Sequence, residues 1–225
     1  MKKLAKRTLA YLIRRISFVY TYSLSLRLKR YRNTLYTMWI QNFFGKVGDK
    51  SSIHYPCKLE GGGSSRISIG SNTCIHSHCI LGCWESYIIH NAEGKLFEQH
   101  FAPEIIIGSN CSIGEYTQIT SINKITIGDG LLTGRYVYIG DNSHGGLSVE
   151  ESVIQPVRRR LKSKGEIIIG NNVWIGDKVT ILGGVTVGDN VIVGANSVVT
   201  HDLPSNSMAS GVPAKVIKRV KECLP

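Results

Sequence analysis

The chain has 225 residues, six cysteines and a formal net charge of +11, and this length suits one domain with a sizeable core. Ten of the 27 Lys and Arg residues lie in residues 1–44, which contain no Asp or Glu, so the remainder, with 17 basic and 16 acidic side chains, is close to neutral. This distribution argues against a surface that coats nucleic acid, which is not an expected partner. The sequence contains no run of eighteen apolar residues, so it predicts no membrane-spanning helix.

Residues 1–44 are predicted to form a basic, helical arm that is rich in aromatic side chains. Apolar residues recur in it at broadly helical spacing, and Lys and Arg fill much of the rest. The apolar run at 9–13 is ended by Arg14 and Arg15 and is followed by no small-residue cleavage site, so it does not resemble a signal peptide. The arm can cap the open end of the next domain or lie on an anionic membrane, and the two roles are compatible.

Residues 45–204 are predicted to form one domain with a period of six, which is clearest from 166 to 202. A helix repeats near 3.6 and a plain strand near two, so this period indicates an all-β hexapeptide β-helix. Three hexads make one triangular coil, and each inward aliphatic residue should lie against its equivalent eighteen residues away. The following glycine is expected to let the chain turn at backbone angles that other residues adopt at a cost. The inward residues are Ile169, Ile175, Ile181, Val187, Val193 and Val199, and the glycines are Gly170, Gly176, Gly188 and Gly194.

Two polar segments interrupt the repeat, at 83–104 and 141–165, and no period constrains their residues. They are therefore where we expect a substrate to be recognised. After residue 204 the chain leaves the solenoid through a Gly-Val-Pro turn at 211–213 and continues as a tail over 205–225.

The cysteines allow two interpretations. Cys57, Cys79 and Cys111 each follow an inward aliphatic residue by four positions, where a buried free thiol packs well. A metal cluster is the alternative, because Cys74, Cys79 and Cys83 lie close together with His76 and His78 between them, although their spacing matches no common zinc pattern. Free cysteines favour a reducing, cytoplasmic location, with the arm as a peripheral contact at the inner face of the membrane.

Three runs carry a family resemblance: Asn-Val-Trp-Ile-Gly at 172–176, Val-Gly-Ala-Asn-Ser-Val-Val at 193–199 and Gly-Val-Pro-Ala-Lys at 211–215. They resemble the hexapeptide-repeat acyltransferases, and most closely the maltose, galactoside and polysaccharide O-acetyltransferases, over about residues 105–218. The resemblance implies a left-handed coil, acetyl-CoA as co-substrate with no metal required, and a homotrimer with each active site between neighbouring solenoids. It also implies that the tail closes over the coenzyme A (CoA) site.

The same resemblance implies the catalytic residues. His144, in the second interruption, matches the family's general base, and a neutral imidazole can take a hydroxyl proton near pH 7. Asp141 either orients that ring or simply sits on a turn, and Glu150 is a weaker candidate for the orienting role. Gln118 lies near the position of the family's oxyanion-stabilising asparagine, which this chain lacks.

The hexad spacing carries the family's cofactor contacts onto seven residues. Asp177 replaces a frequent serine, Ala195 lies where the pantetheine arm passes, and the two lysines match cations near the phosphates. An ordinary coil residue and a solvated charge are the alternatives for Ala195 and Lys215. The expected cofactor residues are Trp174, Asp177, Ala195, Thr200, His201, Lys215 and Lys218.

The sequence thus predicts an O-acetyltransferase that acts on a sugar or a surface-polysaccharide precursor, with a carbohydrate or glycolipid acceptor. An acetyltransferase for a small molecule, such as an antibiotic or serine, is the alternative within the family. A metalloenzyme resembling the γ-carbonic anhydrases and a non-catalytic structural solenoid are the alternatives of other classes.

Overall fold

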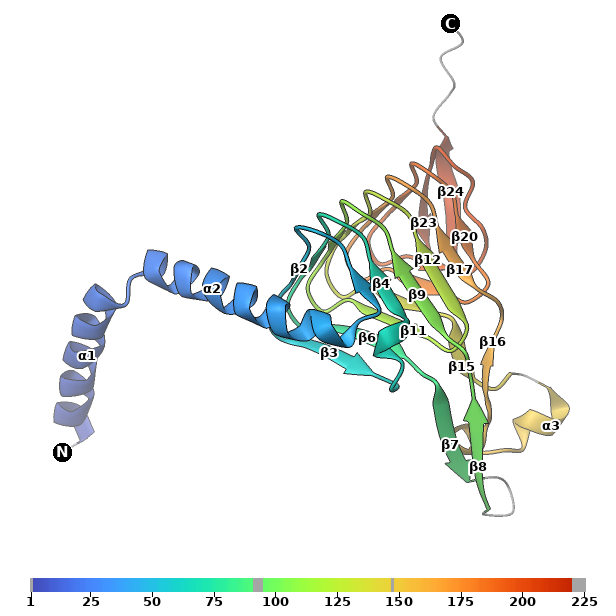
Figure 1. Cartoon of the computed structure of the whole chain (residues 1–225), viewed down its shortest axis with the longest axis horizontal. Coiled ribbons are helices and arrows are strands. Elements are labelled where there is room, and N and C mark those ends of the chain that lie inside the picture. The colour runs from blue at the N-terminus through green and yellow to red at the C-terminus, as the bar shows by residue number, and fades with distance from the viewer. Residues whose placement is uncertain (1, 91–94, 147, 220–225) are drawn as a thin grey trace, which may run out of the picture.

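The computed structural model of the chain describes residues 2–90, 95–146 and 148–219, so small parts of the expected arm, interruptions and tail lie outside the described residues. It is a three-sided solenoid of stacked coils with two helices extending from its N-terminal end (Figure 1). Strands from successive coils pair in parallel and form three long sheets, so the predicted parallel β-helix is confirmed. The expected helical arm is confirmed as well.

Each side of the prism is one sheet, and its strands follow one another at every turn of the coil. The first sheet contains β1 (Lys46–Val47), β4 (Ile67–Ile69), β9 (Glu104–Ile107), β12 (Lys124–Ile127), β17 (Ile167–Ile169) and β20 (Thr186–Val187). The second contains β2 (Ser52–Ile53), β5 (Cys74–Ile75), β10 (Ser112–Ile113), β13 (Leu132–Thr133), β18 (Trp174–Ile175), β21 (Ile192–Val193), β23 (Ser207–Gly211) and β24 (Ala214–Arg219). The third contains β3 (Cys57–Glu60), β6 (Cys79–Cys83), β11 (Gln118–Ser121), β14 (Tyr138–Gly140), β19 (Thr180–Leu182) and β22 (Val198–Val199).

The core is a set of aliphatic columns that run along the solenoid axis. Ile169 pairs with Val187, Ile175 with Val193 and Ile181 with Val199, which is the expected offset of eighteen residues. These six side chains are at most 1% exposed. The period of six therefore fixes which residues point inward, and the apolar area that they bury stabilises the stack.

The glycines after the inward residues have a different role from the expected one. Gly170, Gly176 and Gly188 have no left-handed backbone angles; the positive φ values fall two residues later, at residues such as Asn172 and Asn190. A Cβ atom on Gly176 would lie 2.6 Å from the backbone nitrogen of Ala195 in the next coil. The glycines are thus required by the close approach of successive coils, and asparagine, which tolerates φ > 0, makes the turn.

The arm consists of α1 (Lys2–Val19) and α2 (Tyr22–Ile40), followed by the short helix η1 (Gln41–Phe43). The second half of α2 packs on the first coil: Ile40 is buried, the Thr37 hydroxyl bonds with the backbone of Ile53, and the Tyr36 hydroxyl donates to the carbonyl of Cys57. This part of the arm is a cap. Among the described residues, no helix is long and apolar enough to cross a bilayer.

Buried thiols line the solenoid as the packing interpretation predicts. Cys57, Cys79, Cys83 and Cys111 are at most 7% exposed. Burial raises the pKa of Cys57, Cys79 and Cys83 to about 12, so these thiols stay protonated. Cys79 and Cys83 are buried in β6 of the third sheet, whereas Cys74 lies on the outer face of the second sheet, so among the described residues these three thiols do not share one metal cluster.

Candidate active site

The two interruptions of the repeat form two hairpins that meet beside the third sheet. The first pairs β7 (Ser86–His90) with β8 (Leu96–His100), and the second pairs β15 (Asn142–His144) with β16 (Leu161–Ser163), with α3 (Val149–Ser152) and η3 (Pro156–Arg158) between its strands. The Gln99 side chain accepts from the backbone N–H of Leu161 at 2.8 Å and donates to its carbonyl at 3.1 Å. The guanidinium of Arg160 lies 4.3 Å from the centre of the Phe97 ring. These contacts join both hairpins into one unit.

His144 lies in a pocket of about 140 Å³ between this unit and the coils. The Tyr87 ring meets the imidazole edge-on, with 5.6 Å between the ring centres. Burial raises the pKa of the Tyr138 hydroxyl, with a further contribution from the charge of Asp141, so Tyr138 remains a hydrogen-bond donor at neutral pH. The pocket is lined by Glu60, Trp84, Tyr87, Gln118, Thr120, Tyr138, Asn142, His144 and Leu161.

Gln118 lines the same pocket as His144, although the two are far apart in sequence. It belongs to β11, and it pairs with Tyr138 of β14, the strand that leads to His144. The parallel register therefore places an amide donor on the wall of the pocket that holds the candidate base, as an oxyanion-stabilising group would need.

Asp141 faces a different set of groups. Its side chain is 1% exposed, and its two oxygens accept hydrogen bonds from the Ser121 hydroxyl at 2.5 Å, the Ile122 amide at 2.9 Å and the Asn123 amide at 3.0 Å. None of its hydrogen bonds among the described residues reaches His144. This arrangement favours the turn-forming role over the orienting role. Glu150, at the start of α3, is exposed. Among the residues that the structure describes, it likewise makes no hydrogen bond with His144.

Four of the expected cofactor residues lie on the second sheet or directly after one of its strands: Trp174, Ala195, Lys215 and Lys218. Trp174 is 52% exposed, and the register runs from it through Ile192 and Met208 to Lys218 on β24. At strand spacing, these three steps span about 14 Å. Lys215 of β24 pairs with Ser210 of β23. Ser210 in turn lies against Gly194, the residue before Ala195. An exposed indole and two exposed lysines therefore share one face.

Asp177, Thr200 and His201 lie at corners. The Asp177 carboxylate accepts from the backbone N–H of Arg135 at 2.7 Å and so stabilises a turn. Thr200 and His201 follow β22 in the third sheet, and their side chains lie 2.8 Å apart. They are on the corner that leads to His144, whereas Trp174, Ala195 and the lysines are on another face of the same chain. One chain therefore does not gather all the predicted residues around one point.

Sequence reasoning missed Glu60, Trp84, Tyr87 and Tyr138 as pocket residues. Trp84 and Tyr87 belong to the first interruption, where recognition was expected, but the absence of a period there left their neighbours undetermined. Glu60 and Tyr138 belong to ordinary hexads, and nothing in those hexads marks them as pocket residues. Only the pairing of their strands with β6 and β11 shows that they line the pocket.

Comparison with known proteins finds similarity to hexapeptide-repeat transferases. A family model described as the bacterial transferase hexapeptide (six repeats) matches residues 166–201. WbbJ of Escherichia coli (strain K12), assigned to lipopolysaccharide biosynthesis as an O-acetyl transferase, is 40% identical over 171 residues, which cover 74% of this chain and 78% of WbbJ. Galactoside O-acetyltransferase of the same strain is 38% identical over 127 residues, or 54% of this chain and 57% of that protein.

Solved structures show the same architecture. A variant of AntD, an N-acyltransferase from Bacillus cereus in complex with dTDP and coenzyme A, superposes with a TM-score of 0.61 at 23% identity and covers 82% of this chain and 89% of its own. A maltose O-acetyltransferase from Clostridium difficile 630 gives 0.51 at 26% identity, with coverage of 81% and 73%. The solenoid is thus the expected left-handed β-helix, and the relationships favour an acyltransferase over a carbonic anhydrase or a structural solenoid. The chain belongs to the hexapeptide-repeat acyltransferase family.

Proposed function

We propose that the enzyme transfers an acetyl group from acetyl-CoA to a hydroxyl of a carbohydrate, in a precursor of a surface polysaccharide, with His144 as general base. The observation that carries this proposal is the position of His144 in a small pocket built from both interruptions and the coils. The similarity to WbbJ and to galactoside O-acetyltransferase supports a sugar acceptor over an antibiotic or serine.

The chemistry follows from the groups in the pocket. His144 takes the proton of the attacking hydroxyl as its oxygen bonds to the thioester carbon, a step typically worth 10²–10⁴-fold in rate. The Gln118 amide donates to the carbonyl oxygen while it carries negative charge. The carbon–sulfur bond then breaks, and the imidazolium returns its proton to the CoA thiolate. No covalent acyl-enzyme is needed, because the thioester is already activated.

Acceptor recognition is assigned to the aromatic and polar groups around His144. The Trp84 and Tyr87 rings offer flat apolar faces for the C–H side of a sugar ring. The Glu60 carboxylate and the Asn142 amide supply hydrogen-bond partners for its hydroxyls. A pocket of about 140 Å³ accommodates one part of a sugar ring, which leaves the rest of a longer glycan outside.

The cofactor is assigned to the face that runs from Trp174 to Lys218. This face is separated from His144 by a corner of the prism, so the two halves come together most simply across a subunit boundary. A cyclic homotrimer has one kind of heterologous contact, in which each subunit offers two unlike faces. In this proposal one subunit supplies His144 and its neighbour supplies Trp174, Ala195 and the tail lysines.

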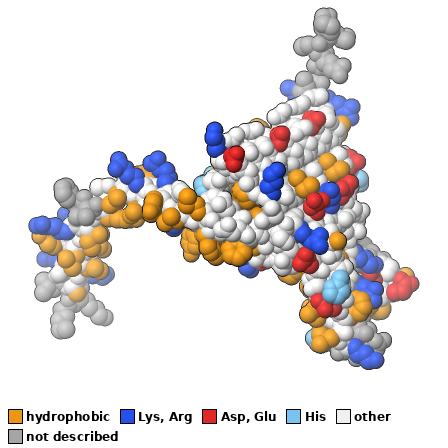
Figure 2. Space-filling model, in the orientation of Figure 1, with side chains coloured by type: hydrophobic (Ala, Val, Ile, Leu, Met, Phe, Trp, Pro, Cys, Tyr) orange, Lys and Arg blue, Asp and Glu red, His pale blue; other side chains and the backbone are white. Residues whose placement is uncertain are grey.

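The arm is assigned to the cytoplasmic face of an anionic membrane, where lipid-linked glycan precursors would be acetylated. Figure 2 shows hydrophobic side chains along one side of α2 and Lys and Arg along the other. On α1, Leu9, Leu12, Ile13 and Ile16 are each at least 50% exposed. An amphipathic, basic helix with aromatic residues binds such an interface through its apolar face and its charge.

The direct test is His144→Ala in the full chain, assayed with acetyl-CoA against a panel of sugars and lipid-linked glycans. Transfer should fall at least about 100-fold, with CoA affinity and thermal unfolding unchanged. His90→Ala, an exposed histidine on β7, is the matched control and should keep full activity. Turnover within tenfold of wild type in His144→Ala would reject His144 as the base.

A further inference from the structure

Three metal-ligand side chains meet on the outer face of the second sheet. Cys74 and His76 are two residues apart on and just after β5, so both project outward while Ile75 between them is buried. His54 follows β2 on the preceding coil, and the register that pairs Ile53 with Ile75 sets it beside His76. The stack therefore brings together one thiol and two imidazoles from two coils.

Their geometry suits a shared cation. The ligand atoms of His54, Cys74 and His76 all lie within 4.8 Å of one another, and the Cys74 sulfur is 3.6 Å from Nε2 of His54. Tetrahedral zinc with Zn–S near 2.3 Å and Zn–N near 2.0 Å requires a sulfur–nitrogen separation of about 3.5 Å. The two imidazole rings are edge-to-face, with 5.1 Å between their centres.

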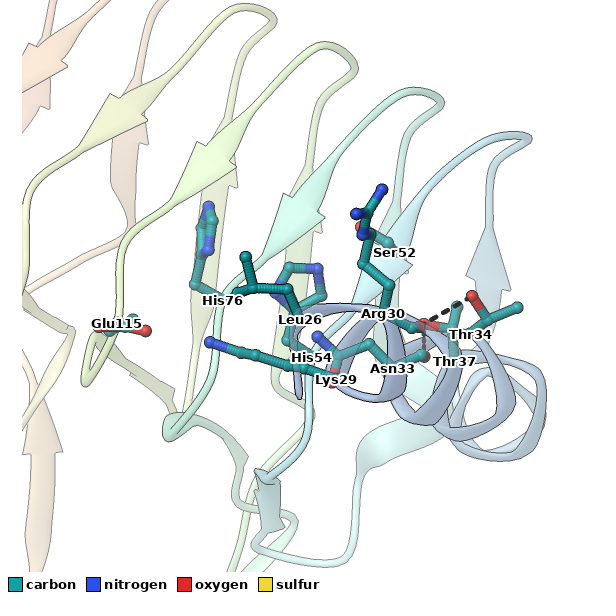
Figure 3. Close-up of a pocket in the computed structure, with 10 residues that line it drawn as sticks. All are labelled: Leu26, Lys29, Arg30, Asn33, Thr34, Thr37, Ser52, His54, His76 and Glu115. Carbon is teal, nitrogen blue, oxygen red and sulfur yellow. Dashed lines mark hydrogen bonds between the residues drawn. The ribbon is translucent and has the colours of Figure 1, made fainter. Parts of the chain in front are cut away.

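The surroundings supply further groups. Figure 3 shows His54 and His76 on the wall of a cavity of about 530 Å³ beneath α2, with Glu115 on the next coil and Lys29 reaching across from the helix. The Ser112 hydroxyl lies 3.3 Å from Nε2 of His76 and can hold that ring in place. The Glu115 carboxylate lies 3.5 Å from the Arg135 guanidinium and adds a negative charge to the lining of this cavity.

We propose that His54, Cys74 and His76 form a zinc site that ties the first two coils together beneath α2. Water takes the fourth position. A thiolate with two imidazoles is a donor set that zinc binds well. The site stabilises the N-terminal end of the solenoid and takes no part in acetyl transfer, which is assigned to the third sheet.

The experiment uses the untagged full chain, stripped with chelator and titrated with Zn²⁺ and with Co²⁺. We expect one equivalent of metal per chain, a thiolate-to-Co²⁺ charge-transfer band in the near ultraviolet, and a higher thermal midpoint with Zn²⁺ present. Cys74→Ser should abolish the band and weaken Zn²⁺ binding at least about 100-fold. Cys111→Ala and His100→Ala, which remove a buried thiol and an exposed imidazole elsewhere, should leave both unchanged.

A second variant, His76→Gln, provides the same test if Cys74→Ser fails to fold. It should weaken Zn²⁺ binding by a similar factor and abolish the rise in thermal midpoint. A charge-transfer band that survives Cys74→Ser, metal binding that survives His76→Gln, or wild-type protein that binds less than half an equivalent of Zn²⁺ at micromolar concentration would overturn the proposal.

Discussion

The Asp141 carboxylate accepts a 2.5 Å hydrogen bond from the Ser121 hydroxyl of the preceding coil, although His144 lies only three residues further along the chain. Two backbone amides complete the set of donors to this buried carboxylate. Asp141 thus anchors the point where the second interruption leaves the coil. It fixes the start of the segment that carries His144, and none of its hydrogen bonds in the described part of the chain goes to the imidazole.

Asp141→Ala should therefore be a stability variant. Its loss leaves the buried Ile122 amide and the buried Ser121 hydroxyl without this acceptor, while the Asn123 amide keeps the Ser121 oxygen at 3.2 Å, and we expect the free energy of unfolding in urea to fall by about 3 kcal/mol. Asp189→Ala, which removes an exposed carboxylate that accepts from Asn171, is the matched control and should cost less. If Asp141→Asn instead kept wild-type stability and lost activity 100-fold, the carboxylate would have an orienting role.

The two tail lysines should act on cofactor affinity. Lys215→Ala and Lys218→Ala are each expected to raise the dissociation constant of CoA about tenfold, because each removes a cation from the proposed phosphate-binding face. Calorimetry with CoA and with dephospho-CoA distinguishes the 3′-phosphate from the pyrophosphate. Lys124→Ala, on the first sheet, serves as the control. An unchanged affinity in both tail variants would remove them from the CoA site.

Subunit mixing tests whether the site is shared. His144→Ala disables one face, and Ala195→Trp should block CoA on the other, so each homotrimer should be inactive. Refolded together in equal amounts, the two variants should recover about a quarter of wild-type activity, since random mixing leaves that fraction of clefts intact. Mixed trimers, confirmed by native mass spectrometry, that show no activity would mean that each cleft belongs to one chain.

The arm should determine membrane binding. Each basic residue near an anionic surface contributes about 1 kcal/mol, so Arg14→Glu combined with Arg15→Glu should lower partition onto phosphatidylserine vesicles at least about tenfold. The binding of the wild type should weaken with salt. Lys46→Glu combined with Lys50→Glu changes the charge of the solenoid by the same amount and is the control. Wild-type protein that never sediments with the vesicles would leave the arm with only its capping role.

The sequence by itself determined the solenoid, because a strict period of six makes every coil the template for the next. The inward columns, the free buried cysteines and the places where the repeat is interrupted all follow from that period. His144 could be proposed as the general base because the resemblance extends across the second interruption.

Only the tertiary structure decided which residues meet outside the repeat. Tyr87 reaches His144 because two hairpins lock together through Gln99 and the backbone of Leu161, contacts that no period predicts. His54 joins Cys74 and His76 because adjacent coils align them, and sequence separation hides that alignment. The physical reason is the same in each case: a repeat specifies inward side chains by their burial, whereas outward and inserted side chains depend on the register between coils.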